Sequence, residues 1–155
     1  MGRRVRASAA YFAFMLENQI VVRPRYSETD QMGYVYYGRY AEYFEIGRTE
    51  LVRELGIPYS RFEREDGIML PVIELQVNYK TPARYDDALT ITTQLKEPPT
   101  ARIRFDYQIV NEQQELVVTG HVVLVFIHTH TRRPCRPPRF FLEALVQGGM
   151  PGIEL

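Results

Sequence analysis

The second half of the chain alternates between apolar and polar residues over long stretches, which is the period of a β-strand with one buried face. Residues 73–80, 89–96 and 103–109 alternate cleanly, and residues 116–128 form a fourth apolar stretch. In this last stretch residues 122–127 are apolar on both faces, as in a central strand that is covered on both sides. The pattern predicts four consecutive strands, with turns at 81–87, 97–100 and 111–115.

The first half of the chain predicts one strand and one long helix. Residues 20–26 are rich in β-formers and give a short strand. From Tyr36 to beyond Leu51 the apolar residues recur on one helical face, and Gly56 with Pro58 marks the end of the helix. Because glycine weakens a helix, Gly47 inside it indicates a close approach to the sheet. The pattern thus predicts an α+β fold, with a curved antiparallel β-sheet wrapped around one long central helix.

Residues 20–147 form the predicted domain, with an N-terminal extension at 1–19 and a C-terminal tail at 148–155 that we expect to be frayed. Short helices are expected at 59–65 and 140–146. The extension has basic and then apolar residues, which is the outline of a secretory signal, but no clear small-residue cleavage site follows. We therefore interpret it as a plain extension.

The composition argues against nucleic-acid binding, membrane insertion and an intrachain disulfide. The 155 residues contain 19 basic and 19 acidic side chains, so no strong field favours nucleic acid or an anionic membrane. No apolar run approaches the roughly 20 residues of a membrane helix, so stable membrane insertion is not expected. The single cysteine excludes an intrachain disulfide and favours a reducing compartment.

The stretch from Tyr26 to Arg48 contains the candidate chemistry. Asp30 lies in a turn just before the predicted helix, whose free N–H groups and dipole favour developing negative charge. A carboxylate beside such an oxyanion-binding helix end is suited to acyl transfer. The alternative is that Asp30 only caps the helix or its turn. Gly33 lets the turn approach a ligand closely, or is an ordinary turn glycine.

Several short blocks resemble the 4-hydroxybenzoyl-CoA thioesterase family, and above all its short bacterial acyl-CoA thioesterases, some of which are associated with the Tol–Pal system. The blocks span roughly residues 20–131 and are Asp30, Met32-Gly33, Val35-Tyr36, Tyr40, Phe44-Glu45, Gly47-Arg48, Val77-Asn78-Tyr79, Pro82-Ala83-Arg84 and Asp86-Asp87. The resemblance implies the hotdog fold, a cytoplasmic location and hydrolysis of an acyl-CoA thioester to a free acid and coenzyme A. It also implies a homodimer, paired again into a homotetramer.

The resemblance implies that Asp30 is the catalytic aspartate, acting either as nucleophile on the thioester carbonyl or as general base for water. Tyr37 matches a position that is His in one branch, so an Asp–His pair is absent; its backbone N–H remains a candidate oxyanion donor. Gly33 completes the predicted catalytic set. The predicted substrate-binding residues are Tyr36, Arg84, Arg132 and Arg133. The arginines are candidate partners for the phosphates of coenzyme A, and the alternative for Arg132 and Arg133 is a solvated face.

No metal and no redox cofactor is expected, since His128 and His130 have no third ligand at matching spacing. Glu45 and Arg48 are three apart on the helix and are expected to pair as structural support. Two alternatives remain for the function: hydrolysis of an acyl carrier protein thioester, with the carrier protein as a partner, and a non-catalytic acyl-CoA-binding protein of the same fold. The replacement of His by Tyr37 keeps the second alternative open.

Overall fold

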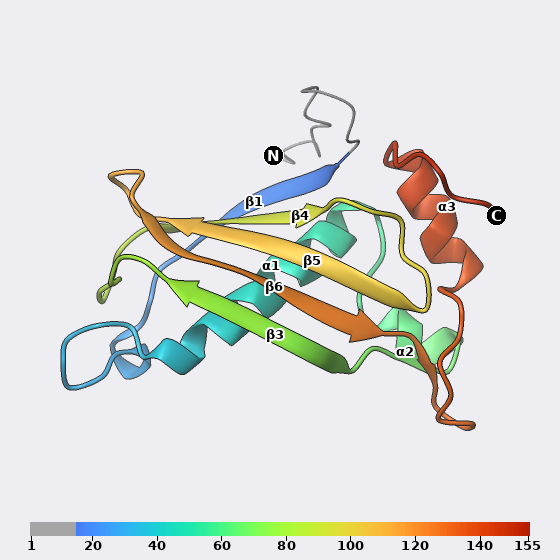
Figure 1. The fold of residues 1–155 in the computed structure, drawn as a ribbon, viewed down its shortest axis with the longest axis horizontal. Helices are drawn as coiled ribbons and strands as arrows, with labels where there is room; N and C mark the ends of the chain where they lie inside the picture. The colour runs from blue at the N-terminus through green and yellow to red at the C-terminus, as the bar shows by residue number, and fades with distance from the viewer. Residues whose placement is uncertain (1–14) are drawn as a thin grey trace.

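The computed structural model describes residues 15–155, in which a five-stranded antiparallel sheet wraps around a long helix (Figure 1). The strands of the main sheet are β1 (Leu16–Val22), β3 (Val72–Tyr79), β4 (Leu89–Leu95), β5 (Arg102–Val110) and β6 (Leu116–Val125). The helices are α1 (Tyr40–Glu54), α2 (Arg61–Glu65) and α3 (Arg139–Gln147), with 3-10 turns η1 (Tyr26–Glu28) and η2 (Tyr37–Arg39). A small second sheet pairs β2 (Ile68–Met69) with β7 (Ile127–His128).

The main sheet has the strand order β1-β4-β5-β6-β3, and every neighbouring pair is antiparallel. One face of this sheet packs against α1, so the apolar residues of β4, β5 and β6 are buried there, whereas Ile73 and Leu75 of the edge strand β3 are about half exposed. This arrangement confirms the predicted α+β architecture with a sheet around one long helix.

Two glycines allow α1 to lie close to the sheet. A Cβ on Gly47 would overlap Thr93 and would lie 3.1 Å from Ile91 Cγ2. On β6, a Cβ on Gly120 would overlap the carbonyl oxygen of Gln76 and would lie 2.8 Å from the ring of Phe44. That ring stacks on Tyr107 with the centroids 4.2 Å apart. The inference that Gly47 faces the sheet is thereby confirmed.

Beyond the C-terminal end of α1, aromatic side chains close the core. Phe62 of α2 contacts Phe126 and Phe141, with ring centroids 6.2 Å and 5.2 Å away. Met150 is also buried, and its N–H donates to the carbonyl of Leu145. The expectation of a frayed tail is therefore wrong at Met150, because its side chain packs in the core.

Three predicted element boundaries differ from the structure. β1 begins at Leu16, inside the predicted extension, and ends at Val22, because residues 16–22 pair in continuous register with β4. The helical segment starts as the 3-10 turn η2, and α1 itself begins only at Tyr40. The last predicted strand is interrupted at Phe126, after which β7 joins the second sheet. The signal-like pattern at the N-terminus lies outside the described residues.

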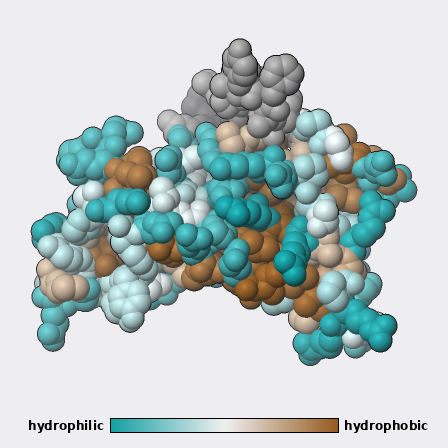
Figure 2. Space-filling view, viewed as in Figure 1, coloured by the Kyte–Doolittle hydropathy of each residue, from teal (hydrophilic) through white to brown (hydrophobic). Residues whose placement is uncertain are grey.

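The outer face of the sheet and its β3 edge differ in character. The outer face is mostly hydrophilic (Figure 2). β3 is an edge strand, and apolar surface gathers where it begins. Val72, Ile73 and Leu75 are each about half exposed there. An exposed apolar edge strand favours pairing with another strand.

Candidate active site

Asp30 lies in a tight loop ahead of η2. The N–H of Asp30 donates to the carbonyl of Tyr34 at 2.9 Å, and the N–H of Gly33 donates to the carbonyl of Asp30 at 3.0 Å. Gly33 has φ +78, a left-handed conformation that suits glycine. The Asp30 Oδ1 atom accepts the N–H of Met32 at 2.9 Å. One carboxylate oxygen is thus fixed by the turn, while Oδ2 has no hydrogen-bond partner within residues 15–155.

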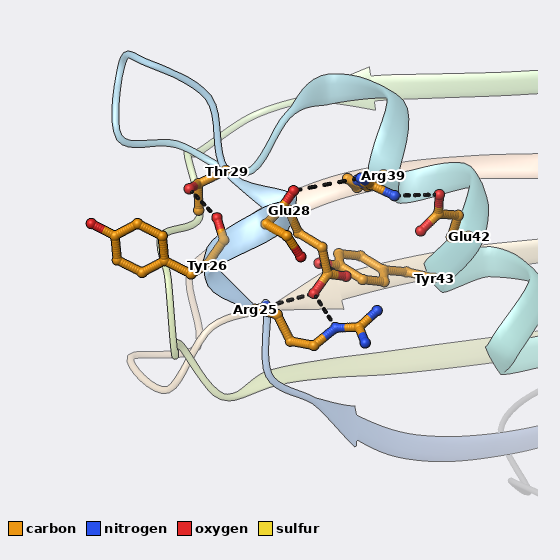
Figure 3. A network of polar contacts seen from close by, with 8 residues as sticks. Arg25, Tyr26, Glu28, Thr29, Arg39, Glu42 and Tyr43 are labelled. Carbon is orange, nitrogen blue, oxygen red and sulfur yellow. Dashed lines mark hydrogen bonds and ion pairs between the residues drawn. The ribbon is translucent and has the colours of Figure 1, made fainter.

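The base of this loop is held by the buried carboxylate of Glu28 (Figure 3). Glu28 accepts hydrogen bonds from the N–H and Nε of Arg25, and from the hydroxyl of Tyr43 on α1 at 3.2 Å. Burial alone would raise the pKa of Glu28, but the hydrogen bonds from Arg25 and Tyr43 hold it below its usual value. Its backbone carbonyl also accepts the N–H of Tyr36 at 2.9 Å. Glu28 therefore joins the loop to both η2 and α1.

The helical segment begins without a side-chain cap. Neither the N-terminus of η2 nor that of α1 has a capping hydrogen bond, so Asp30 caps its own turn and not the helix. The N–H groups of Tyr37 and Gly38 donate to no backbone carbonyl among the described residues. Two free donors at the positive end of a helix can bind an oxyanion.

Tyrosine side chains surround this helix start. The rings of Tyr36 and Tyr37 are 4.5 Å apart, and the Tyr37 side chain is 63% exposed. The neighbouring phenol of Tyr37 raises the pKa of Tyr36, and the carboxylate of Asp30 acts in the same direction. A Cβ on Gly38 would lie 2.9 Å from the Tyr36 ring, so glycine lets that ring cover the turn.

Arg84 is far from the loop in sequence but close to it in space. Its guanidinium carbon lies 5.0 Å from the ring centroid of Tyr34, a cation–π contact. A Cβ on Gly33 would be 3.7 Å from its Nη1. The N–H of Val35 donates to the carbonyl of Ala83 at 2.8 Å, which fixes the Arg84 turn beside the loop. The fold therefore brings Arg84 beside Gly33 and Tyr34 of the loop that holds Asp30.

Arg132 and Arg133 do not join this group within one chain. They belong to the turn after β7, at the opposite end of the molecule from the Asp30 loop (Figure 1). The N–H of Arg132 donates to the carbonyl of His128, and Arg132 has φ +58. This turn lies next to the start of β3, because β2 immediately precedes that strand and pairs with β7.

The expected pairing of Glu45 with Arg48 is wrong. Glu45 points to solvent, whereas Arg48 is only 8% exposed and forms no ion pair with a described residue. Burial opposes its charge, but the neighbouring Tyr107 and Tyr59 hydroxyls keep the pKa of Arg48 raised. The helix turns these two side chains to different faces.

Within residues 15–155, no three His, Cys, Asp or Glu side chains gather closely enough to hold a metal ion. None of the helices in this part of the chain is both long enough and apolar enough to span a bilayer.

Glu28 and Tyr79 are site residues that sequence reasoning missed. The Tyr79 hydroxyl, at the end of β3, donates to the carbonyl of Tyr37 at 3.0 Å. Tyr79 belongs to a recognised block, but no local pattern connects it with a residue 42 positions away. For Glu28 the available signal was its place three residues after Arg25, as in a capping box.

Comparisons with known proteins identify the family and the fold. The family described as the thioesterase-like superfamily matches residues 24–145. The putative acyl-CoA thioesterase YneP of Bacillus subtilis is 35% identical over 97 residues, which are 63% of this chain and 70% of that protein. The acyl-CoA thioester hydrolase YbgC of Escherichia coli O6:H1 is 30% identical over 126 residues, 81% of this chain and 93% of that protein.

A solved structure, the DHNA-CoA thioesterase of Staphylococcus aureus, superimposes with a TM-score of 0.78 at 35% identity. The match covers 84% of this chain and 89% of that one. The family match spans residues 24–145, and the structural match also covers most of the chain. The chain belongs to the thioesterase-like superfamily and has its hotdog fold.

Proposed function

We propose that this protein is a cytoplasmic acyl-CoA thioesterase, active as a homodimer or homotetramer, with Asp30 as its catalytic carboxylate. The observation that carries the proposal is that the partly free carboxylate of Asp30 lies in the loop just before two free N–H groups at the start of η2. The names of the relatives YneP and YbgC support the same substrate class. The single cysteine supports a reducing compartment.

The chemistry follows from these groups. The thioester carbonyl oxygen accepts the N–H groups of Tyr37 and Gly38, which stabilise the negative charge of the tetrahedral intermediate. As general base, Asp30 takes a proton from a water molecule whose oxygen adds to the carbonyl carbon. As nucleophile, Asp30 adds directly, and water then hydrolyses the resulting mixed anhydride. In both routes the carbon–sulfur bond breaks, and the departing thiolate of coenzyme A takes up a proton.

Thiol release from a panel of acyl-CoA esters tests the activity. We expect purified protein to release one thiol for each ester hydrolysed, with activity that survives exhaustive chelation, because the mechanism uses no metal. Acyl carrier protein thioesters in the same assay distinguish the carrier-protein alternative. Binding of acyl-CoA without thiol release from any ester would favour the non-catalytic alternative and contradict our proposal.

Assembly through β3 explains how the distant arginines can serve the same site. When two β3 edges pair antiparallel about a twofold axis, the start of one strand lies beside the end of the other. The turn with Arg132 and Arg133 adjoins the start of β3, whereas Tyr79 at its end contacts Tyr37. Each basic turn then approaches the Asp30 loop of the partner. Arg84 and the partner's turn together offer cations for the phosphates of coenzyme A.

Hybrid dimers test this shared site. One copy would have Asp30→Asn, and the other would have both Arg132→Ala and Arg133→Ala. If the arginines act across the interface, a coexpressed hybrid contains one site in which all three residues are intact, and we expect about half of the wild-type activity at limiting substrate. No recovery in the hybrid, or full activity of a monomer in light scattering, would contradict the shared site and leave the thioesterase assignment intact.

A further inference from the structure

The last residue of the edge strand β3 is bonded to the start of the helical segment. The Tyr79 hydroxyl donates a hydrogen bond to the Tyr37 carbonyl at 3.0 Å. That carbonyl belongs to the same peptide unit as the N–H of Gly38. At the start of η2, the Gly38 N–H is one of two donors that have no backbone partner among the described residues.

We propose that Tyr79 is a positioning residue that holds the Gly38 N–H in the orientation needed to bind the oxyanion. This inference rests on the thioesterase function proposed above. A peptide unit is planar, with its C=O and N–H pointing in opposite directions. A hydrogen bond that fixes the carbonyl of Tyr37 therefore also fixes the direction of the Gly38 N–H. Glycine at position 38 has no side chain to restrain this peptide unit, so an external restraint has more effect here than elsewhere.

The same hydrogen bond also strengthens the donor. An accepted hydrogen bond polarises the peptide unit, which makes its N–H a better donor by cooperativity. Oxyanion stabilisation depends on donors that are oriented before the reaction begins. Tyr79 therefore contributes both orientation and polarity, although it does not touch the reacting atoms.

Tyr79 is itself held in place by its neighbours. Its ring packs edge-on against Tyr40, with centroids 5.7 Å apart and planes at 69°. Its backbone is paired with Val118 of β6. Partial burial raises the pKa of Tyr79, and the nearby Tyr37 phenol adds to the effect, so the hydroxyl keeps its proton at neutral pH. A carbonyl oxygen can only accept, and a protonated phenol is the donor it requires.

The test is Tyr79→Phe, which keeps the ring and its contact with Tyr40 and removes only the hydroxyl. Deleting an oxyanion donor costs about 10²–10³ in kcat. Because this variant loosens a donor and does not remove it, we expect kcat to fall about tenfold with KM unchanged within about twofold. The matched control is Tyr85→Phe, since Tyr85 is also exposed and stacks edge-on with Tyr26, but no hydrogen bond of its hydroxyl is present within residues 15–155. We expect kcat of this control to stay within about twofold of wild type.

A second readout does not depend on turnover. Removing the bond to the Tyr37 carbonyl should move the amide ¹⁵N resonance of Gly38 in Tyr79→Phe and leave it in place in Tyr85→Phe. Light scattering and thermal unfolding confirm that both variants keep the wild-type assembly and fold. Equal kcat in wild type and Tyr79→Phe, a rise in KM alone, or an unmoved Gly38 resonance would overturn the positioning role only. A wild-type protein without thioesterase activity would overturn this role and the proposed function together.

Discussion

The two ends of α1 are built in opposite ways. At the C-terminal end the N–H groups of Gly56 and Ile57 donate to the carbonyls of Arg53 and Val52, and Gly56 has φ +83. At the N-terminal end no side chain caps the helical segment, and the side chains of Met32, Tyr36 and Tyr37 beside it are exposed. The C-terminal end is closed by packing, and the N-terminal end is open to solvent.

The difference separates stability from chemistry along a single helix. The closed end rests on buried aromatic contacts, which contribute to the free energy of unfolding without touching a ligand. The open end keeps N–H groups without a backbone partner and a partly free carboxylate, which are the groups that the proposed mechanism uses. Substitutions at the two ends should therefore affect different measurements.

The largest effect is expected at the closed end. Phe62→Ala removes a side chain that is 2% exposed and contacts Tyr59, Phe126, Phe140 and Phe141. Such a cavity should lower the free energy of unfolding by about 3–5 kcal/mol, measured by urea denaturation. Thiol release per folded molecule should be unchanged at low temperature. The control is Ile46→Ala on the exposed side of α1, which should change stability by only about 0.5 kcal/mol.

The next effect is expected at the open end. Asp30→Asn keeps an oxygen that can accept the N–H of Met32, so the loop and the unfolding temperature should be preserved. Because amide nitrogen is neither base nor nucleophile here, kcat should fall at least about 100-fold. Calorimetry with coenzyme A should show binding close to wild type. Near wild-type turnover in the folded variant would exclude Asp30 as the catalytic group.

Glu28→Gln examines the junction between the open end and α1. Replacing the charged acceptor weakens the hydrogen bonds from Arg25 and Tyr43 and should destabilise the fold by about 2 kcal/mol at neutral pH. Since the folded pKa of Glu28 lies below its usual value of 4.5, the stabilisation is present above that pH and is lost as the pH falls through the folded pKa. Denaturation curves of the two proteins should converge on acidification. A difference that does not depend on pH would show that the Glu28 charge is not responsible.

The smallest effect is expected from replacing a glycine by alanine at each end of the helix. Gly33 and Gly56 both have positive φ, and a Cβ on Gly56 would meet no atom within 4 Å. Gly33→Ala and Gly56→Ala should each lower stability by about 1–2 kcal/mol through backbone strain. Only Gly33→Ala should also lower kcat/KM, because it distorts the Asp30 turn. Equal kinetics in the two variants would remove the functional distinction between the two ends.

Sequence patterns predicted the elements in which apolar side chains recur at a regular spacing. The alternating strands and the apolar face of the helix follow from side-chain period, and Gly47 pointed to the close contact of helix and sheet. The first four residues of β1 were missed because Glu17, Asn18 and Gln19 are poor β-formers. Their pairing with β4 outweighs that propensity.

Only those site residues that lie close together in the sequence were predictable. Asp30, Gly33, Tyr36 and Tyr37 are consecutive enough for a motif to reveal them, whereas Arg84 was named only through a resemblance. The hydrogen bond of Tyr79 joins a strand end to a helix start, and no local period encodes it. The burial of Met150 likewise depends on how the chain returns to the core after α3.

Gly47 and Gly120 also determine which parts of the protein are free to diverge. A Cβ on Gly47 would overlap Thr93 of β4, and a Cβ on Gly120 would overlap the backbone of Gln76 and crowd Phe44 of α1, so a larger residue at either position would force the packed elements apart. The distance between α1 and the sheet is therefore fixed. Related sequences that adapt to a larger or smaller acyl group can change the Asp30 loop and β3, while the packing of α1 on the sheet stays the same.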